Sequence, residues 1–347
     1  MSFSPKVVAV TGASGYIGTR LLMQLETNPN VGKIVAFDQK PLPYPIHNIS
    51  FYQRDILSAS LRESLRRNDE DAGEIVPWND SDSIAPLLRL HGVNTLVHLA
   101  CAYSHTDVYQ DWAHEALENL LLLEWVHKAC AAAGVRHEIF LSSHRVYGTH
   151  ADNPVPVDES APLWGDPGDN LGFACFEADD AIQAYMREQE EVAQESRVGI
   201  TILRSCPVLG YSDDRFRAEH VFPFHFLGTG ANPPFQFLHE VDLARLLEQV
   251  IQYGHEGIFN VAGEGVVFLD ELAEITRRKL TQLPYFLAYP AAWLSARIGK
   301  GGLGNWNLNT SRYPIIMSTG KIKQTLNYRF DYTSMEALNA FVNYNSL

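Results

Sequence analysis

Three glycines near the start of the chain have a spacing that permits a tight backbone turn around a ligand. Gly12, Gly15 and Gly18 follow an apolar run at residues 7–10 and precede a helical pattern at residues 16–26. In a strand–turn–helix unit of this kind the glycines allow the turn, let the backbone approach a pyrophosphate, and let the helix pack on the strand. The N–H groups and the positive dipole end of the helix then face the phosphates. The pattern therefore predicts a dinucleotide site.

A carboxylate at residue 38 indicates which dinucleotide this turn would hold. Asp38 lies twenty residues after Gly18 and ends a second apolar run at residues 34–37. Such a carboxylate would accept hydrogen bonds from the adenosine ribose and would repel the 2′-phosphate of NADP. Because the strand, the glycines, the helix and the acid occur in the required order, they are far more specific than a glycine triplet alone. We therefore predict NAD as the cofactor.

The composition is that of an ordinary globular protein and excludes some classes of function. Of the 347 residues, 46% are hydrophobic and 20% are charged, which is typical of soluble globular chains. The formal net charge of −14 argues against a nucleic-acid surface, which needs clustered lysine and arginine. The longest apolar runs are too short to span a membrane. We expect a small-molecule substrate and no nucleic-acid or membrane partner.

The cysteines and the first residues of the chain bear on its location. The four cysteines are scattered and include no C-x-x-C pair: Cys101, Cys130, Cys175 and Cys206. The first residues lack the basic and apolar series of a signal peptide. Both observations favour a cytoplasmic protein with reduced thiols and no metal site.

Strand and helix signals alternate through the first two-thirds of the chain. The six apolar segments that we expect to form strands are residues 7–10, 34–37, 48–52, 95–99, 138–141 and 200–203. Because helical stretches separate them, the connections are right-handed βαβ crossovers and the strands form one parallel sheet covered on both faces. The predicted fold class is α/β, a Rossmann-type doubly wound parallel sheet with a smaller C-terminal substrate lobe.

These elements suggest two domains. We expect residues 1–210 to form the NAD-binding domain, with a segment at about residues 236–262 returning to it. Residues 211–347, where the spacing becomes irregular, would form mainly the substrate-binding lobe. Residues 66–83 are polar and charged and lack apolar periodicity, so we expect an exposed loop insertion there.

Two long helices are predicted at residues 114–133 and 173–194. The first carries leucines around so much of its surface that it should be buried on more than one side.

Several further motifs follow the glycine turn in a fixed order. They are R-D-I at residues 54–56, H-L-A-C at 98–101, L-S-S-H-R-V-Y-G at 141–148, L-R-S-C-P-V-L-G at 203–210, F-L-H-E-V-D-L-A at 237–244 and G-I-F-N-V-A-G at 257–263. This series resembles the extended short-chain dehydrogenase/reductase family, and within it the NAD-dependent epimerase/dehydratase group. The best-known members of that group act on nucleotide sugars, and the resemblance spans nearly the whole chain.

The resemblance implies a cofactor site built from many segments. The residues at the family's cofactor-binding positions are Gly12, Ser14, Gly15, Tyr16, Ile17, Gly18, Asp38, Asp55, Ile56, Leu99, Ala100, Cys101, Asn119, Ser142 and Pro207. Among them Asp55 matches the acid that contacts the adenine, and Asn119 matches the asparagine of the central helix. Ser143 takes the position of the catalytic serine.

The catalytic pair of the family is missing from this chain. In the family a tyrosine and a lysine spaced Y-x-x-x-K lie one helical turn apart, so that both groups reach the same place. The lysine lowers the pKa of the tyrosine, and the tyrosine exchanges a proton with the substrate. Aligning Gly172 with the glycine of Y-G-x-x-K puts Leu171 at the tyrosine position and Cys175 at the lysine position. None of the fifteen tyrosines is followed four residues later by a lysine, so the usual mechanism is absent.

Other groups could replace the missing pair, and each also has a simpler interpretation. Tyr103, just after H-L-A-C, could lie near the nicotinamide and act as an acid, or it could only line the pocket. His144 is next to Ser143 and titrates in the useful range, although a solvated loop histidine is the simpler interpretation. Cys175 could be a redox-sensitive thiol, although buried thiols are usually inert.

The remaining candidates also have simpler interpretations than catalysis. Tyr147 matches a structural tyrosine of the family motif. His225 and His239 lie in the substrate-side half, and His239 is expected to hold backbone within its motif. Glu177 and Asp179 are on the altered helix, where we expect them to be solvated or at a subunit contact.

Two classes of function remain open. The first is an NAD-dependent epimerase/dehydratase or reductase acting on a hydroxyl or carbonyl group, with nucleotide sugars among the candidate substrates and Ser143 bonded to the reacting oxygen. The second is a non-catalytic NAD(H)-binding sensor or regulatory module. Retention of Ser143 favours the first, and loss of both members of the catalytic pair favours the second. The resemblance also implies a homodimer formed through the two long helices.

Overall fold

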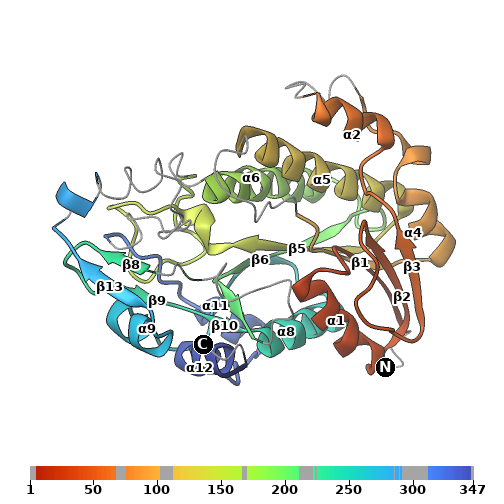
Figure 1. The fold of residues 1–347 in the computed structure, drawn as a ribbon. Helices are drawn as coiled ribbons and strands as arrows, with labels where there is room; N and C mark the ends of the chain where they lie inside the picture. The colour runs from red at the N-terminus through yellow and green to blue at the C-terminus, as the bar shows by residue number, and fades with distance from the viewer. Residues whose placement is uncertain are drawn as a thin grey trace.

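A seven-stranded parallel sheet forms the centre of the protein (Figure 1). The computed structural model describes residues 5–67, 76–101, 112–165, 170–210, 222, 225–284, 286–288, 290 and 312–344. In spatial order the strands are β11 (Gly257–Val261), β6 (Gly199–Ser205), β5 (His137–Ser143), β4 (Thr95–His98), β1 (Lys6–Thr11), β2 (Val31–Asp38) and β3 (Ile49–Gln53). Every neighbouring pair is parallel, as predicted for a Rossmann-type sheet.

The order of connection reverses at the middle of the sheet. From β1 the chain builds β2 and β3 on one side and then returns to add β4 on the other side of β1. In open α/β sheets, ligands bind beyond the carboxyl ends of the strands at such a switch point. Thr11 pairs with His98, and His98 pairs with Phe140, so the carboxyl ends of β1, β4 and β5 lie along one edge. A ligand site is therefore expected at this edge.

The expected strands and helices are present, with small shifts at their ends. All six predicted strands occur, and the first helix, α1, spans Tyr16–Glu26. The long helices are α5 (Trp112–Ala133) and α6 (Asn170–Glu190). The second begins and ends earlier than predicted. The side chain of Gln189 accepts a hydrogen bond from the Val198 N–H at 2.9 Å, which draws the chain toward β6 soon after the helix ends.

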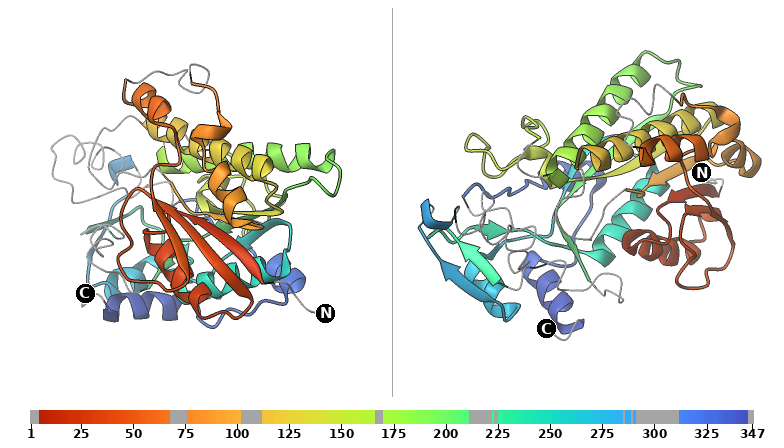
Figure 2. Two further views of the ribbon diagram at one scale, coloured as in Figure 1. Left: turned by 90° about the vertical axis from the view of Figure 1, so that its right-hand side faces the viewer. Right: turned by 45° about the horizontal axis from the view of Figure 1, so that its top comes forward.

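Helices cover both faces of the sheet (Figures 1 and 2). α2 (Ala59–Arg66), α4 (Ala85–His91), α5 and α6 lie on one face, and α1, α8 (Glu240–Tyr253) and α11 (Gly320–Leu326) lie on the other. Successive residues of a strand point to opposite faces. Thus Ala9 packs against the α2–α4–α5 layer, whereas Val8 and Val10 pack against the α1–α8 layer.

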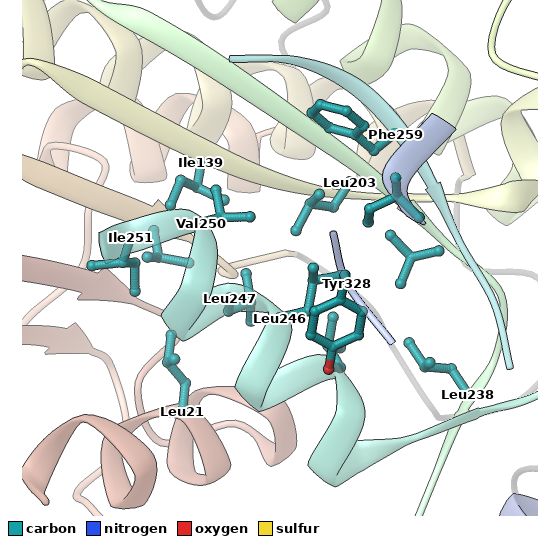
Figure 3. Close-up of a cluster of buried hydrophobic side chains, with 14 of the residues drawn as sticks. Leu21, Ile139, Leu203, Leu238, Leu246, Leu247, Val250, Ile251, Phe259 and Tyr328 are labelled. Carbon is teal, nitrogen blue, oxygen red and sulfur yellow. The ribbon is translucent and has the colours of Figure 1, made fainter. Parts of the chain in front are cut away.

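The larger apolar cluster lies between α8 and the strands (Figure 3). α8 contributes side chains spaced three and four residues apart, which is the pattern of one buried helical face. They are Leu243, Leu246, Leu247, Val250 and Ile251. Ile139 of β5, Leu203 of β6 and Phe259 of β11 meet them from the sheet, and Leu21 of α1 meets them from below. The core thus joins the first helix to the last strand of the sheet.

α8 begins at a histidine cap. The Nδ1 atom of His239 accepts a hydrogen bond from the Val241 N–H at 3.2 Å, and the ring stacks on Tyr332 with centroids 3.8 Å apart. This confirms the expectation that His239 holds backbone. One residue into the helix, Glu240 forms an ion pair with Arg20 of α1 at 3.1 Å, which ties the two helices together.

Short strand pairs and two helices form the end of the molecule opposite β2 and β3 (Figure 1). β8 (His225–Gly228) pairs with β13 (Lys279–Gln282), β9 (Pro234–Phe235) with β12 (Val267–Phe268), and β7 (Val208–Leu209) with β10 (Leu238–His239). α9 (Leu269–Ile275) and α12 (Ser334–Tyr344) pack with them around a separate apolar cluster that includes Phe222, Phe226 and Phe341.

The predicted insertion is only partly a solvated loop. Residues 68–75 lie outside the described part of the chain. After them, Trp78 packs against the α2–α4–α5 cluster, and Asp80–Asp82 form a single 3-10 turn. Asp80 forms an ion pair with Arg89 of α4, so this part of the insertion is anchored to the domain.

None of the helices within the described ranges is long and apolar enough to cross a membrane. Within the same ranges, no group of three or more His, Cys, Asp and Glu side chains is arranged to hold a metal ion.

Candidate functional site

The glycine turn brings three backbone segments closer together than side chains would allow. Gly12 has a φ of +69°, and a Cβ atom on it would lie 2.7 Å from the amide nitrogen of Ala100. A Cβ on Gly18 would lie 2.1 Å from the Gly12 carbonyl oxygen, and one on Gly15 would lie 3.1 Å from the same oxygen. The turn is therefore a backbone cradle that only glycine permits, as its spacing predicts.

α1 starts directly at this cradle, with Gly15 as its N-cap. The first N–H groups of a helix have no partner within the helix, and here they belong to Tyr16, Ile17 and Gly18. The first turn of α1 contains no acidic side chain that would repel an anion. A pyrophosphate at this position would meet amide donors and the positive end of the helix dipole.

Asp38 closes the cradle at the end of β2. Its Oδ2 accepts a hydrogen bond from the Ser14 N–H at 2.9 Å, and its Oδ1 accepts one from the Lys40 N–H at 2.8 Å. Each carboxylate oxygen can accept a second hydrogen bond, so the group can also receive ribose hydroxyls. The cradle, the helix end and the fixed carboxylate together fit NAD, and the same negative charge disfavours a phosphorylated ribose.

A buried histidine fixes the segment after β4. The Nδ1 atom of His98 and the Thr11 hydroxyl are 2.7 Å apart, and Thr11 Oγ1 also accepts the Leu99 N–H at 3.3 Å. Burial lowers the pKa of His98 to about 4, so the ring is neutral near pH 7 while it shares this hydrogen bond with Thr11. Leu99 and Ala100 are thereby held beside Gly12, where the resemblance expects them to pass the cofactor.

The acid expected at the adenine end is also held in place. The Asp55 carboxylate receives two hydrogen bonds from Arg62 of α2, at 2.7 and 2.8 Å. The side chain of Ile56 is buried in the α2–α4–α5 cluster, so a ligand could meet this residue only through its backbone.

Ser142 and Asp179 form part of a buried network. The Ser142 hydroxyl donates to Asp179 Oδ2 at 2.5 Å, and the Arg204 guanidinium contacts both Asp179 oxygens at 2.7 and 3.1 Å. Asp179 is 0% exposed and Arg204 1%. The expectation that Asp179 is solvated or at a subunit contact is therefore wrong, because one helical turn beyond Cys175 the helix faces the sheet. The Ser142 hydroxyl has given its only proton to Asp179, so its side chain could contact a cofactor only as an acceptor.

Tyr147 completes the network. Its hydroxyl donates to Asn260 Oδ1 at 2.7 Å and accepts from Arg204 Nη1 at 3.0 Å. Burial raises the pKa of the Tyr147 phenol, and the neighbouring Arg204 only partly offsets this, so the phenol stays protonated. Tyr147 is structural, as expected.

Ser143 lies on the other face of β5 from Ser142 and ends the strand. Its Oγ accepts the Arg145 N–H at 3.2 Å, so the hydroxyl proton can point toward a ligand. His144 Nδ1 lies 3.5 Å from this oxygen and 3.3 Å from the Ser205 carbonyl oxygen. His144 is half-buried between the ends of β5 and β6, so it is less solvated than a simple loop histidine. The structure thus joins a hydroxyl and an imidazole at the carboxyl end of the sheet.

Leu171 and Cys175, which the sequence alignment puts at the positions of the family's catalytic pair, lie on the first turns of α6. Cys175 is half-buried and packs against the apolar cluster that contains Val146 and Tyr147. The side chain of Leu171 lies outside what the structure describes, as do Tyr103 and the side chain of His225. Glu177 is half-buried on the same helix.

The remaining predicted cofactor residues occupy three separate elements. Cys101 is exposed at the end of a described segment, Asn119 is half-buried on α5, and Pro207 is exposed just after β6. The Pro207 carbonyl oxygen accepts the Leu238 N–H at 3.0 Å.

Two charged residues at the site were not found from the sequence. Arg204 lies within an apolar strand segment. A charged residue in such a segment is expected to be buried and to need a carboxylate partner, so this position could have indicated the pair. Arg62 is on a short amphipathic helix with several arginines, and no local pattern distinguishes it from Arg66 and Arg67.

Lowering the pH should destabilise the fold through His98. Its pKa is about 4 in the folded chain against 6.5 when unfolded, so between these values only the unfolded chain binds the proton. Stability should therefore fall as pH drops from 6.5 to 4, by on the order of 3 kcal/mol from this group. Urea unfolding of the wild type and His98→Asn over this range measures the effect.

The stability gap between these two proteins should narrow toward acid pH, because only the wild type loses the His98 contribution. His137, whose pKa is also lowered to about 4, is present in both and cancels in the difference. A gap that is constant with pH would contradict the assignment.

Breaking the buried pair of Arg204 and Asp179 should be costly. Asp179→Leu or Arg204→Met leaves an uncompensated buried charge, so each should lower the free energy of unfolding by about 3–5 kcal/mol. The double variant should lose much less free energy of unfolding than the sum of the losses in the two single variants. Denaturant unfolding measures all three, with Lys323→Met as the control, because the Lys323–Glu264 pair is solvent-exposed and should contribute at most about 1 kcal/mol. Additive losses would show that the two buried residues do not interact.

Comparison with known proteins places this geometry among related folds. UDP-glucose 4-epimerase from Thermotoga maritima, solved with UDP-glucose, has a TM-score of 0.67 at 18% identity, covering 97% of this chain and 98% of that one. The Bordetella bronchiseptica enzyme WbmG, solved with NAD, has a TM-score of 0.66 at 15% identity, covering 99% and 94%. A dTDP-glucose 4,6-dehydratase from Bacillus anthracis, solved with NAD, has a TM-score of 0.65 at 14% identity, covering 98% and 96%. At these identities the likeness establishes the fold.

Sequence relatives carry no functional description. Uncharacterized proteins Rv0501 of Mycobacterium tuberculosis and Mb0513 of Mycobacterium bovis are each 25% identical over 350 residues, covering 97% of this chain and 83% of theirs.

A family model matches most of the chain. The family model described as "NAD dependent epimerase/dehydratase family" matches residues 8–262, from the middle of β1 to just beyond β11. NAD, the cofactor in that description, is the dinucleotide that the glycine turn and Asp38 predict. This chain belongs to the NAD dependent epimerase/dehydratase family.

Proposed function

We propose that this protein is an NAD-dependent enzyme of the epimerase/dehydratase type that acts on a hydroxyl-bearing carbon of a nucleotide sugar. The observation that carries the proposal is the pair formed by Ser143 and His144, 3.5 Å apart at the carboxyl end of β5. This is the sheet edge that also carries the glycine cradle. The substrate class is supported by structural neighbours solved with UDP-glucose or named for dTDP-glucose.

The cofactor would lie along this edge from β3 to β6. Gly12, Gly15 and Gly18 would receive the pyrophosphate and Asp38 the adenosine ribose, and the other predicted positions would line the rest of the path. When bound, NAD supplies a nicotinamide carbon that accepts a hydride from an alcohol carbon.

Ser143 and His144 would handle the reacting oxygen and its proton. Because Ser143 Oγ already accepts the Arg145 N–H, its own proton is available to hydrogen-bond the reacting oxygen. The Ser205 carbonyl can only accept, so it favours the His144 tautomer with a proton on Nδ1 and basic character at Nε2. The imidazole could then exchange a proton during hydride transfer, the role that a tyrosine takes in the family.

A second candidate is a non-catalytic NAD(H)-binding module. It is favoured by Cys175, which packs against apolar side chains where the family has an ammonium group. A neutral thiol cannot lower the pKa of a neighbouring acid or hold a ribose as a lysine does. Both candidates share the cofactor site and differ in whether the nicotinamide is used.

The wider assignments stay predictions. They are the two-domain division at about residue 210, a homodimer through α5 and α6, and a cytoplasmic location. Half-buried apolar side chains on both helices, such as Leu117 of α5 and Met186 of α6, are compatible with the dimer.

Turnover should depend on both members of the proposed pair. Purified protein is incubated with NAD and a panel of UDP- and dTDP-sugars, and the sugar nucleotides are separated to detect conversion while NADH absorbance is followed. Ser143→Ala and His144→Asn should each lower kcat by about 10²-fold or more, as expected for loss of a hydrogen bond to the reacting oxygen and of an acid–base group.

Exposed residues of the same types provide the controls. Ser160→Ala and His47→Asn alter surface positions and should leave kcat unchanged. NAD binding without conversion of any sugar nucleotide would contradict the enzyme and support the binding module. Full activity in His144→Asn would exclude the proposed proton role.

A further inference from the structure

Arg62 connects three elements at the adenine end of the proposed cofactor site. From α2, its Nε and Nη2 atoms donate to the two oxygens of Asp55, at 2.7 and 2.8 Å. Its Nη1 atom forms an ion pair with Glu118 of α5. Arg62 is 16% exposed and Glu118 17%, so the arginine is anchored at both ends in a largely desolvated place. Such a two-pronged pair fixes the plane of the carboxylate as well as its position.

One of the two Asp55 carboxylate oxygens can still accept a further hydrogen bond. Oδ1 accepts from Arg62 Nη2 and from the Leu57 N–H at 3.1 Å, which uses both of its acceptor sites. Among the described residues, Oδ2 accepts only from Arg62 Nε. The Asp55–Arg62 pair therefore leaves one acceptor site on a carboxylate that cannot rotate.

The place of Asp55 on the sheet indicates what this acceptor meets. Asp55 follows β3, the strand next to β2, and the Arg54 N–H donates to the Asp38 carbonyl oxygen at 2.9 Å. Asp55 is thus the next carboxylate along the edge after the one proposed to bind the ribose, on the side away from the glycine turn. Beyond that ribose a dinucleotide carries its base. A carboxylate can only accept hydrogen bonds, and adenine offers an exocyclic amino group.

We propose that Arg62 is a positioning residue that holds Asp55 Oδ2 toward the adenine amino group and so selects adenine over a base with a carbonyl at that position. Glu118 binds the Nη1 side of the guanidinium and restricts its rotation toward solvent. The inference rests on NAD binding as set out under the proposed function. A purely structural role, in which Arg62 only ties α2 to α5, would change stability without changing which base is preferred.

The test compares NAD with its deamino analogue, nicotinamide hypoxanthine dinucleotide, by calorimetric titration of the full chain. The analogue replaces the amino donor by a carbonyl acceptor, so the wild type should bind NAD at least about tenfold more tightly. In Arg62→Gln the ratio of the two dissociation constants should fall to within about threefold. Arg67→Gln is the matched control, because Arg67 is the C-cap residue of the same helix, is 69% exposed and pairs only with exposed Glu63 among the described residues. It should keep the wild-type ratio.

The possible results distinguish a positioning role of Arg62 from a purely structural one. A wild type that binds NAD and prefers it, with an Arg62→Gln variant that keeps this preference, overturns the inference and leaves NAD binding intact. A wild type that binds both dinucleotides equally also overturns it, because Asp55 then does not contact the base. Failure of the wild type to bind either dinucleotide overturns the proposed function and this inference together.

A second variant covers the case in which Arg62→Gln does not fold. Arg62→Lys keeps the charge but loses the two-pronged contact, so it should lower the preference for NAD by several-fold. An unchanged preference in a folded Arg62→Lys protein would count against the positioning role.

Discussion

The approach of the Gly12 and Gly18 backbones sets the geometry on which the rest of the site depends. A Cβ on Gly18 would lie 2.1 Å from the Gly12 carbonyl oxygen. Because glycine has no Cβ, α1 can begin directly after the end of β1. A Cβ on Gly12 would lie 2.7 Å from the Ala100 amide nitrogen, so the segment after β4 also packs directly against this turn. Thr11 and the neutral His98 then hold the two strand ends together. The parallel pairing of β1, β4 and β5 puts their carboxyl ends at one edge, and the glycine turn lies at that edge.

The buried pair of Arg204 and Asp179 supports the other half of that edge. Removing two charges from water costs several kcal/mol each, so the pair is sustained by the hydrogen bonds around it. Ser142, Gln183 and Tyr147 supply those bonds. The network holds α6, the helix that carries Leu171 and Cys175, against β5 and β6. Ser143 and His144 lie at the carboxyl end of β5, next to this helix.

The central fold could be read from the sequence because local signals and long-range packing agree there. The glycine turn, the acid at residue 38 and the alternating apolar runs each have a short-range cause, so the sheet and its switch point follow. The burial of Asp179 and its pairing with Arg204 could not be predicted in this way. Whether a charged side chain on a helix faces solvent or the sheet depends on the rotation of the helix and on a partner 25 residues away. The contact of His144 with Ser205 and the ion pairs of Arg62 could not be predicted for the same reason, since these partners come from other elements.

The central claim is that the glycine cradle and Asp38 hold NAD. Calorimetric titration of the purified protein with NAD and with NADP tests it most directly, because the two ligands differ only in the phosphate that Asp38 would face. The structure predicts saturable binding of one NAD per chain, with a dissociation constant at least about tenfold lower than that of NADP. Absence of NAD binding, or equal affinity for the two dinucleotides, would contradict it.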